Sequence, residues 1–159
     1  ECASTGLHGA NRVSSNSLLA AMVFAHRAYL DAVEKVNQQP AISEKAIPDW
    51  DNAGTTAPKE MIVITQSVKE LKLLMSDYVG IVRNNDRLQR ANRRLDLLFE
   101  ETVNLYKKSE LSPQLCELRN MITVSYLIVK GAELRYESRG LHYNTDYPGK
   151  SAIVQNTIL

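Results

Sequence analysis

The chain has 159 residues, of which 44% are apolar and 23% are charged, and its net charge is +1. This length fits one domain, or a small domain with part of another, and it is sufficient to bury a core. A charge near zero argues against nucleic acid or a membrane as the main partner, and no apolar run approaches the ~20 residues that span a bilayer.

The N-terminal part, residues 1–37, is predicted to be a loop followed by a helix. The first ten residues are small and contain glycine, which is typical of a loop. From Ser15 onwards apolar residues recur at three- and four-residue steps, and others lie on the remaining sides. We therefore expect the first half of this helix to be buried nearly all round. Because the chain begins with Glu1 rather than methionine, we also expect it to be part of a longer polypeptide.

Residues 38–65 are predicted to be a linker. Three prolines and a glycine interrupt any periodicity in this stretch. At its end, the β-branched run from Met61 to Thr65 predicts a short extended strand.

Residues 66–140 are predicted to form an antiparallel bundle of three helices, because the connections between them are short. The predicted helix starts are Ser67, with Glu70 as its partner in a capping box, then Asn84 or Asn85, and then Ser112 followed by Pro113. The predicted inner faces are Leu71, Met75, Tyr78 and Val82; Leu88, Ala91, Leu95, Leu98, Thr102 and Leu105; and Leu115, Leu118, Ile122, Ser125, Val129, Ala132 and Tyr136. Gly140 is expected to cap the third helix in a left-handed conformation, and residues 141–159 are expected to be irregular. The predicted fold is therefore mainly α.

The most informative motif is the stretch from Gly6 to Arg12, G-L-H-G-A-N-R, followed by S-N-S-L-L at residues 15–19. It is a glycine loop that leads into the N-terminus of an apolar helix. Such an end presents unpaired N–H groups and positive charge, and it binds phosphates, carboxylates or an acceptor that gains negative charge. The same polar residues also fit an ordinary helix cap, and spacing alone leaves both interpretations open.

Residues 1–19 resemble the flavin-contacting segment of the succinate dehydrogenase/fumarate reductase flavoprotein family. The version found here, T-G-L-H-G-A-N-R-x-x-S-N-S-L-L, is that of the branch that oxidises L-aspartate. The stretches from Met75 to Arg83 and from Glu137 to Pro148 agree with the same branch, so the resemblance spans most of the chain.

The resemblance implies FAD as the cofactor, with Glu1, Ser17 and Leu18 as its contacts, and Arg12 as the residue that holds a substrate carboxylate. The implied reaction is hydride transfer from the α-carbon of L-aspartate to the flavin, which gives iminoaspartate for NAD biosynthesis. Oxygen or fumarate is the implied electron acceptor. Donors at a helix N-terminus would stabilise the negative charge that develops on the ring.

The sequence contains no G-x-G-x-x-G fingerprint and no match to the arginine that is the family's catalytic base. The resemblance therefore implies that no catalytic residue lies in these 159 residues. We expect the chain to act only together with the rest of its polypeptide. Two alternatives stay open: the same region of a succinate dehydrogenase or fumarate reductase subunit, and a helical interaction module.

Several other polar residues invite a functional interpretation. A basic stripe at helical spacing, formed by Arg83, Arg87, Arg90 and Arg94, is interpreted as a solvated face or a contact with missing domains rather than a nucleic-acid site. A structural role is expected for His142. Glu137, Arg139 and Asp146 are expected to tie the tail to the helices.

Neither cysteine is expected to bind a metal. Cys2 and Cys116 form no CxxC motif, and no histidine lies at metal-ligand spacing from them. Reduced thiols of this kind are typical of a cytoplasmic protein.

Overall fold

The computed structural model describes residues 5–7, 14–38, 47–56 and 61–159. These residues are mainly helical, as predicted, and they belong to two units, Glu1–Asp51 and Asn52–Leu159. Each unit is described by itself below.

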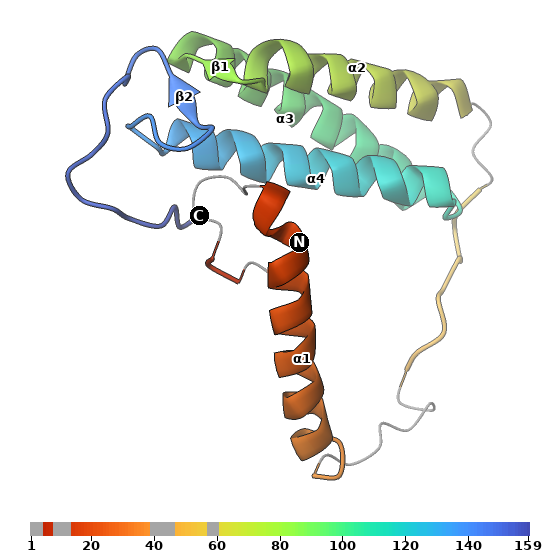
Figure 1. Cartoon of the computed structure of the whole chain (residues 1–159). Coiled ribbons are helices and arrows are strands. Elements are labelled where there is room, and N and C mark those ends of the chain that lie inside the picture. Colours follow the sequence, from red (N-terminus) through yellow and green to blue (C-terminus); the bar gives the residue numbers. More distant parts are fainter. Residues whose placement is uncertain (1–4, 8–13, 39–46, 57–60) are drawn as a thin grey trace. The chain divides into compact units, whose positions relative to one another are not determined.

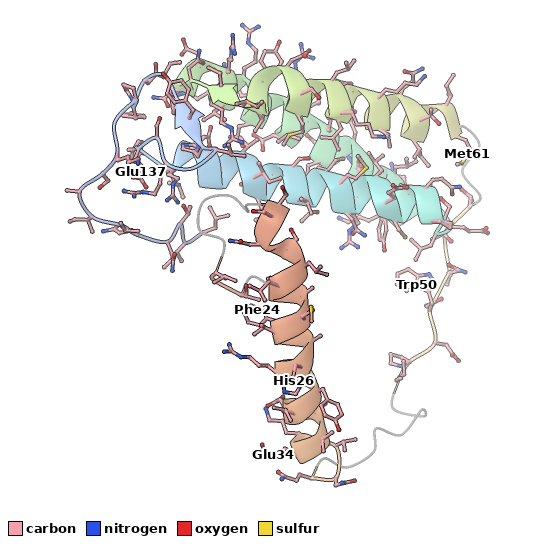
Figure 2. All side chains as sticks on the ribbon, viewed as in Figure 1. Phe24, His26, Glu34, Trp50, Met61 and Glu137 are labelled. Carbon is pink, nitrogen blue, oxygen red and sulfur yellow. The ribbon has the colours of Figure 1, made fainter. Side chains whose placement is uncertain are left out.

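The first unit consists of a 3-10 turn, η1 (Ser14–Asn16), and a long helix, α1 (Ser17–Lys35). The helix predicted from Ser15 onwards is confirmed. The prediction that its first half is buried is wrong for the described residues, since no residue of α1 is buried. The side chains of α1, among them Phe24 and His26, project from the helix (Figure 2). An apolar helix needs a covering surface, and the described part of this unit contains no other element that could supply one.

The second unit is built on three long helices, α2 (Met61–Val79), α3 (Asn85–Lys108) and α4 (Pro113–Glu133). They pack against one another, and successive helices run in opposite directions (Figure 1). Apolar side chains from all three form one core, whose buried members are Ile64, Leu71, Leu74, Val79, Leu88, Ala91, Leu95, Leu98, Leu115, Leu118, Ile122, Val129 and Ala132. The inner faces predicted for the second and third helices are confirmed up to Ala132.

The start of α2 differs from the prediction in two ways. Met61 to Thr65, expected to be a strand, forms the first turn of the helix, and Ile64 is buried in the core. The predicted capping box is also wrong, because Ser67 and Glu70 lie inside α2. The β-branched run is held in a helix because only a helix places Ile64 and Leu71 on the same buried face.

The starts of α3 and α4 agree with the prediction. Asn84 precedes α3 in an extended conformation, and its side chain accepts a hydrogen bond from the N–H of Arg87 at 2.8 Å. Ser112 does the same for Leu115 at 3.2 Å, with Pro113 at the first helical position. Both caps are local interactions, which a single sequence can indicate.

The C-terminal end departs from the prediction. The helix α4 ends at Glu133, so Tyr136 lies beyond it and is 65% exposed, with its ring edge-on to Tyr147. Gly140 has the expected positive φ of 61°, but it forms a turn between Arg139 and His142 and does not cap the helix. The tail is not wholly irregular either, because two short parallel strands pair, β1 (Val82–Arg83) and β2 (Tyr143–Asn144).

Candidate functional site

The sequence assigns four residues to a flavin site, and the structure describes two of them. Ser17 and Leu18 are the first two residues of α1. Glu1 and Arg12 lie outside the described residues, so their roles stay predictions.

At the N-terminus of α1, Asn16 and the first turn supply none of the groups that usually neutralise a helix end. Asn16 has helical backbone angles (φ −84°, ψ −4°), and its side chain makes no capping hydrogen bond. The first turn contains no acidic residue. The positive end of the helix dipole therefore has no compensating carboxylate or side-chain cap from Asn16 and the first turn.

The two side chains at this end fit a flavin ring. The Oγ of Ser17 is shielded from water but has no hydrogen-bond partner among the described residues. Leaving a buried hydroxyl unpaired costs about 1–3 kcal/mol, so a bound acceptor at this position would be favoured. Leu18 is 74% exposed and offers an apolar contact beside that hydroxyl. A flat apolar ring with hydrogen-bond acceptors on its edge matches this combination.

Neither a metal site nor a membrane span occurs in the described part of the chain. Three or more His, Cys, Asp or Glu side chains do not gather anywhere among those residues in a way that could hold a metal ion. None of the described helices is long and apolar enough to cross a bilayer.

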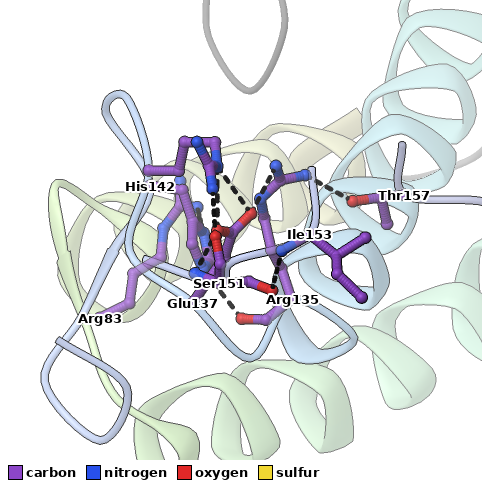
Figure 3. A network of polar contacts seen from close by, with 8 residues as sticks. Arg83, Arg135, Glu137, His142, Ser151, Ile153 and Thr157 are labelled. Atoms are coloured by element: carbon purple, nitrogen blue, oxygen red, sulfur yellow. Dashed lines mark hydrogen bonds and ion pairs between the residues drawn. The ribbon is translucent and has the colours of Figure 1, made fainter. Parts of the chain in front are cut away.

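A second polar cluster joins the end of α2 to the tail through His142 (Figure 3). The Nη1 of Arg83 lies 2.9 Å from the Nδ1 of His142. A guanidinium can only donate, so this nitrogen must be the acceptor, and the ring proton lies on Nε2, 3.3 Å from the carbonyl of Arg135. Burial, together with the positive charge of Arg83, lowers the pKa of His142 below its usual value of 6.5. The histidine is therefore held neutral, as a connector between two segments.

Arg83 also closes the C-terminal end of α2. Its Nε donates to the carbonyls of Val79 at 3.1 Å and Gly80 at 3.0 Å. These carbonyls have no partner inside the helix, and a cation is favourable at this end of the helix dipole. One side chain thus fixes both the end of α2 and the position of His142.

Glu137 is the centre of the neighbouring ion-pair network. Its buried carboxylate accepts hydrogen bonds from Arg139 Nε at 2.9 Å, from Arg135 Nη2 at 3.0 Å and from the N–H of Ser151 at 3.0 Å. Burial alone would raise the pKa of Glu137, but the hydrogen bonds from Ser151 and Arg139 and the charges of both arginines outweigh it and lower the pKa. The carboxylate is therefore held ionised, and it binds the tail to the end of α4.

Asp146 fixes the start of α3. Its Oδ2 accepts a hydrogen bond from the N–H of Asn85 at 2.7 Å. The side chain of Asn85 also bonds to Asn144 at 3.2 Å and to the hydroxyl of Tyr147 at 3.3 Å. The prediction that Asp146, together with Glu137 and Arg139, ties the tail to the helices is confirmed.

The sequence did not predict the hydrogen bonds that Arg83, Arg135 and Asn144 make in this cluster. Arg83 ends the stretch from Met75 that carries part of the family resemblance, and that position was a usable signal. Arg135 and Asn144 gave no signal. Most polar atoms of this cluster bond to one another, although the Nε of Arg135 is shielded and has no partner among the described residues. The cluster therefore holds the chain together and is not an open site.

Comparisons with known proteins find similarity to one family of flavoproteins. Residues 68–153 match the family model described as "Fumarate reductase flavoprotein C-term". The L-aspartate oxidase of Vibrio cholerae is 45% identical over 159 residues, which are 100% of this chain and 29% of that protein. The chloroplastic L-aspartate oxidase of Arabidopsis thaliana is 38% identical over 165 residues, covering 93% of this chain and 25% of that protein.

A solved structure is also similar to this chain in fold and in sequence. Mycobacterium smegmatis Sdh1 in complex with UQ1 has a TM-score of 0.72 and 33% sequence identity, over 92% of this chain and 26% of that chain. The chain thus spans less than a third of the length of these relatives. Since the family model covers more than half of its residues, the chain belongs to the family of fumarate reductase flavoprotein C-terminal domains.

Proposed function

We propose that this chain is the C-terminal part of an FAD-dependent L-aspartate oxidase, which oxidises L-aspartate to iminoaspartate in NAD biosynthesis. The observation that carries the proposal is the 45% identity to the Vibrio cholerae L-aspartate oxidase across all 159 residues. The N-terminal motif T-G-L-H-G-A-N-R-x-x-S-N-S-L-L supports the same assignment. In that enzyme, helices α2 to α4 would be the C-terminal three-helix bundle.

FAD, when bound, accepts a hydride from the α-carbon of the substrate. The N–H groups at the N-terminus of α1 and the hydroxyl of Ser17, which has no partner among the described residues, would stabilise negative charge on that acceptor. Leu18 supplies an apolar contact, Glu1 a polar contact to the cofactor, and Arg12 a planar pair of donors for a substrate carboxylate.

The remaining parts of the site come from the rest of the polypeptide in this proposal. They are the phosphate-binding fingerprint and the catalytic base, neither of which occurs in these 159 residues. Oxygen or fumarate serves as the electron acceptor, and the protein is cytoplasmic. The tobacco and Arabidopsis relatives are named as chloroplastic, so the proposed cytoplasmic location applies to a protein of the bacterial type.

A second candidate is the same region of a succinate dehydrogenase flavoprotein. It is favoured by the likeness to the two Mycobacterium smegmatis Sdh1 structures, at 31% and 33% identity. The identity to proteins named L-aspartate oxidase is higher, between 41% and 45% for seven of the eight relatives compared. The oxidase is therefore the preferred function.

The test compares two substrates on the longer polypeptide that contains this chain, purified with FAD. We expect L-aspartate to reduce the flavin and succinate to leave it oxidised under the same conditions, as followed by flavin absorbance. Reduction by succinate and not by L-aspartate would establish the second candidate instead. The 159-residue chain alone should bind no FAD measurably, and a yellow preparation with stoichiometric flavin would contradict that expectation.

A further inference from the structure

A basic groove lies beside the start of α3, and no part of the proposed function uses it. Its volume is about 450 Å³, and its lining residues are Tyr78, Asn84, Asp86, Arg87, Arg90 and Arg93. The three arginines follow one another at three-residue steps, so each is displaced by about 4.5 Å along α3 from the one before. They form a short row of exposed guanidinium groups.

These arginines have no carboxylate partner among the described residues. Arg87 donates only to the carbonyl of Val82 at 3.4 Å, and Arg90 lies over the ring of Tyr78, 5.9 Å from its centroid. Arg93 makes no ion pair with any described residue. The neighbouring Arg94, in contrast, is paired with Glu70 at 3.7 Å. The groove therefore carries three guanidinium groups that no described carboxylate neutralises.

The lining has an excess of positive charge, with three guanidinium groups and one carboxylate, that of Asp86. Arginine and tyrosine are the side chains enriched at the contact points of protein interfaces. We infer that this groove is a docking surface for an acidic segment of another polypeptide.

The exposure of the arginines favours a polypeptide over a small anion. A single exposed ion pair contributes little, so useful affinity requires several carboxylates bound together. In an extended peptide, alternate side chains project from one face at intervals of about 6.6 Å, so neighbouring carboxylates can meet successive parts of the row. Nucleic acid is disfavoured, because the net charge of the whole chain is only +1.

The groove differs in chemistry from the surfaces that other parts of the same polypeptide would cover. The apolar residues exposed on α4, such as Val124, Leu127 and Ile128, suit a permanent contact of that kind. The groove is polar and charged instead, which is typical of contacts that form quickly and are sensitive to salt.

The test measures binding of a fluorescently labelled twelve-residue polyglutamate peptide to the 159-residue chain by anisotropy. We expect binding at low salt that weakens towards about 0.15 M salt, because exposed charges are then screened. The triple variant Arg87→Gln, Arg90→Gln, Arg93→Gln should weaken binding about tenfold, as expected for the loss of three exposed ion pairs.

A matched triple variant carries the same change in net charge at exposed lysines outside the groove, Lys72→Gln, Lys107→Gln and Lys108→Gln. It should weaken binding by less than about twofold. Equal losses in the two triple variants would overturn the inference, as would the absence of any binding at low salt. Tighter binding of a single-stranded DNA of the same charge would overturn it in favour of nucleic acid.

Asp86→Asn provides a test that does not depend on loss of binding. Removing the only carboxylate of the lining should tighten peptide binding about twofold, because it removes a repulsive charge. Unchanged or weaker binding in a variant with a normal melting curve would also overturn the inference.

Discussion

At the scale of single residues, two buried side chains that follow the end of α4, Glu137 and His142, set the expected response to acid. The pKa of His142 and the pKa of Glu137 are both lowered in the folded chain. The unfolded chain therefore binds protons more readily at both positions, and folding is less favourable as the pH falls. For His142 the stability is complete above the unfolded pKa of 6.5 and is lost below it. For Glu137 the loss begins below 4.5.

Replacing His142 by glutamine should separate these two responses. The melting temperature of the wild-type chain should fall between about pH 7.5 and about pH 5.5, since the pKa of His142 is lower in the folded chain and unfolding therefore takes up protons at this residue. His142→Gln should be less stable at the higher pH, because Arg83 loses its acceptor, but its melting temperature should change less with pH.

The control is His26→Gln, which changes an exposed histidine on α1. It should keep the wild-type pH dependence. Circular dichroism melts of the three chains provide the measurement, and an unchanged pH response in His142→Gln would refute the role of this histidine. The other charged groups that face His142 are Arg83, Arg135 and Glu137.

Arg12 carries the prediction on which most of the proposed chemistry depends. A guanidinium offers two parallel donors to a carboxylate, and lysine keeps the charge but loses this geometry. In the longer enzyme, Arg12→Lys should retain FAD but lose about 10²-fold in kcat/KM through misplacement of the substrate. Arg12→Leu should lose more, because it removes the charge as well.

Steady-state kinetics on L-aspartate, with flavin content and melting temperature, decide between a substrate contact and a packing role. Arg94→Lys, at an exposed arginine on α3, is the matched control and should behave as wild type. Near-normal kcat/KM in an Arg12→Leu enzyme that is replete with flavin would exclude the substrate role.

At the scale of elements, what the sequence predicted well was local. The starts of α3 and α4 follow from Asn84 and Ser112, whose side chains bond to N–H groups three residues ahead. The strand expected from Met61 to Thr65 was wrong because β-branched residues favour strands only on average, and burial of Ile64 in the core decides otherwise. Pairing of Val82 with Tyr143 depends on packing between distant segments, which no local pattern contains.

In the polar and flavin-site residues, too, local features could be predicted and contacts between distant segments could not. Ser17 and Leu18 could be placed at a helix N-terminus from the motif that they belong to, and the structure places them there. The link between Arg83 and His142 could not be predicted, since it requires the end of α2 and the tail to meet. Exposure of α1 could not be predicted either, because its apolar pattern indicates burial without naming the covering surface.

Serine substitutions should distinguish a true helix cap from the capping box that the sequence suggested. Ser112→Ala removes the acceptor for the N–H of Leu115 and should cost about 1 kcal/mol of stability. Ser67→Ala, inside α2, should leave stability unchanged or raise it by up to about 0.5 kcal/mol, because alanine has the higher helix propensity. Urea denaturation of the two variants checks this, and a larger loss for Ser67→Ala than for Ser112→Ala would contradict the structure.

At the scale of the whole molecule, the two units differ in how far their apolar residues are covered. The second unit buries side chains from α2, α3 and α4 in one core, with Leu88, Leu95 and Leu115 fully inaccessible. In the first unit Leu18, Leu19 and Met22 are more than 60% exposed. The chain spans 29% of the Vibrio cholerae relative, so a covering surface for α1 is expected from the rest of such a polypeptide.

The second unit should therefore fold without the first, and its limits can be tested by shortening the chain. We expect Asn52–Leu159 to melt cooperatively, since it contains the whole core. Residues 66–140, the boundaries suggested by sequence alone, should be much less stable. That shorter chain lacks Ile64, whose loss from the core costs about 2–5 kcal/mol. It also lacks Asp146, and the loss of a helix cap costs about 0.5–2 kcal/mol. Against a total stability of about 5–15 kcal/mol these losses are large.

A chain of residues 61–147 restores both missing parts, the first turn of α2 and the segment that holds His142, Asn144 and Asp146. It should regain a cooperative transition, slightly below that of Asn52–Leu159, because the bond from the N–H of Ser151 to Glu137 is still missing. Thermal melts followed by far-ultraviolet circular dichroism measure all three chains. The structure indicates that the first turn of α2 and the segment from His142 to Asp146 both stabilise the fold. If residues 66–140 melt as cooperatively and at the same temperature as Asn52–Leu159, neither part has this role.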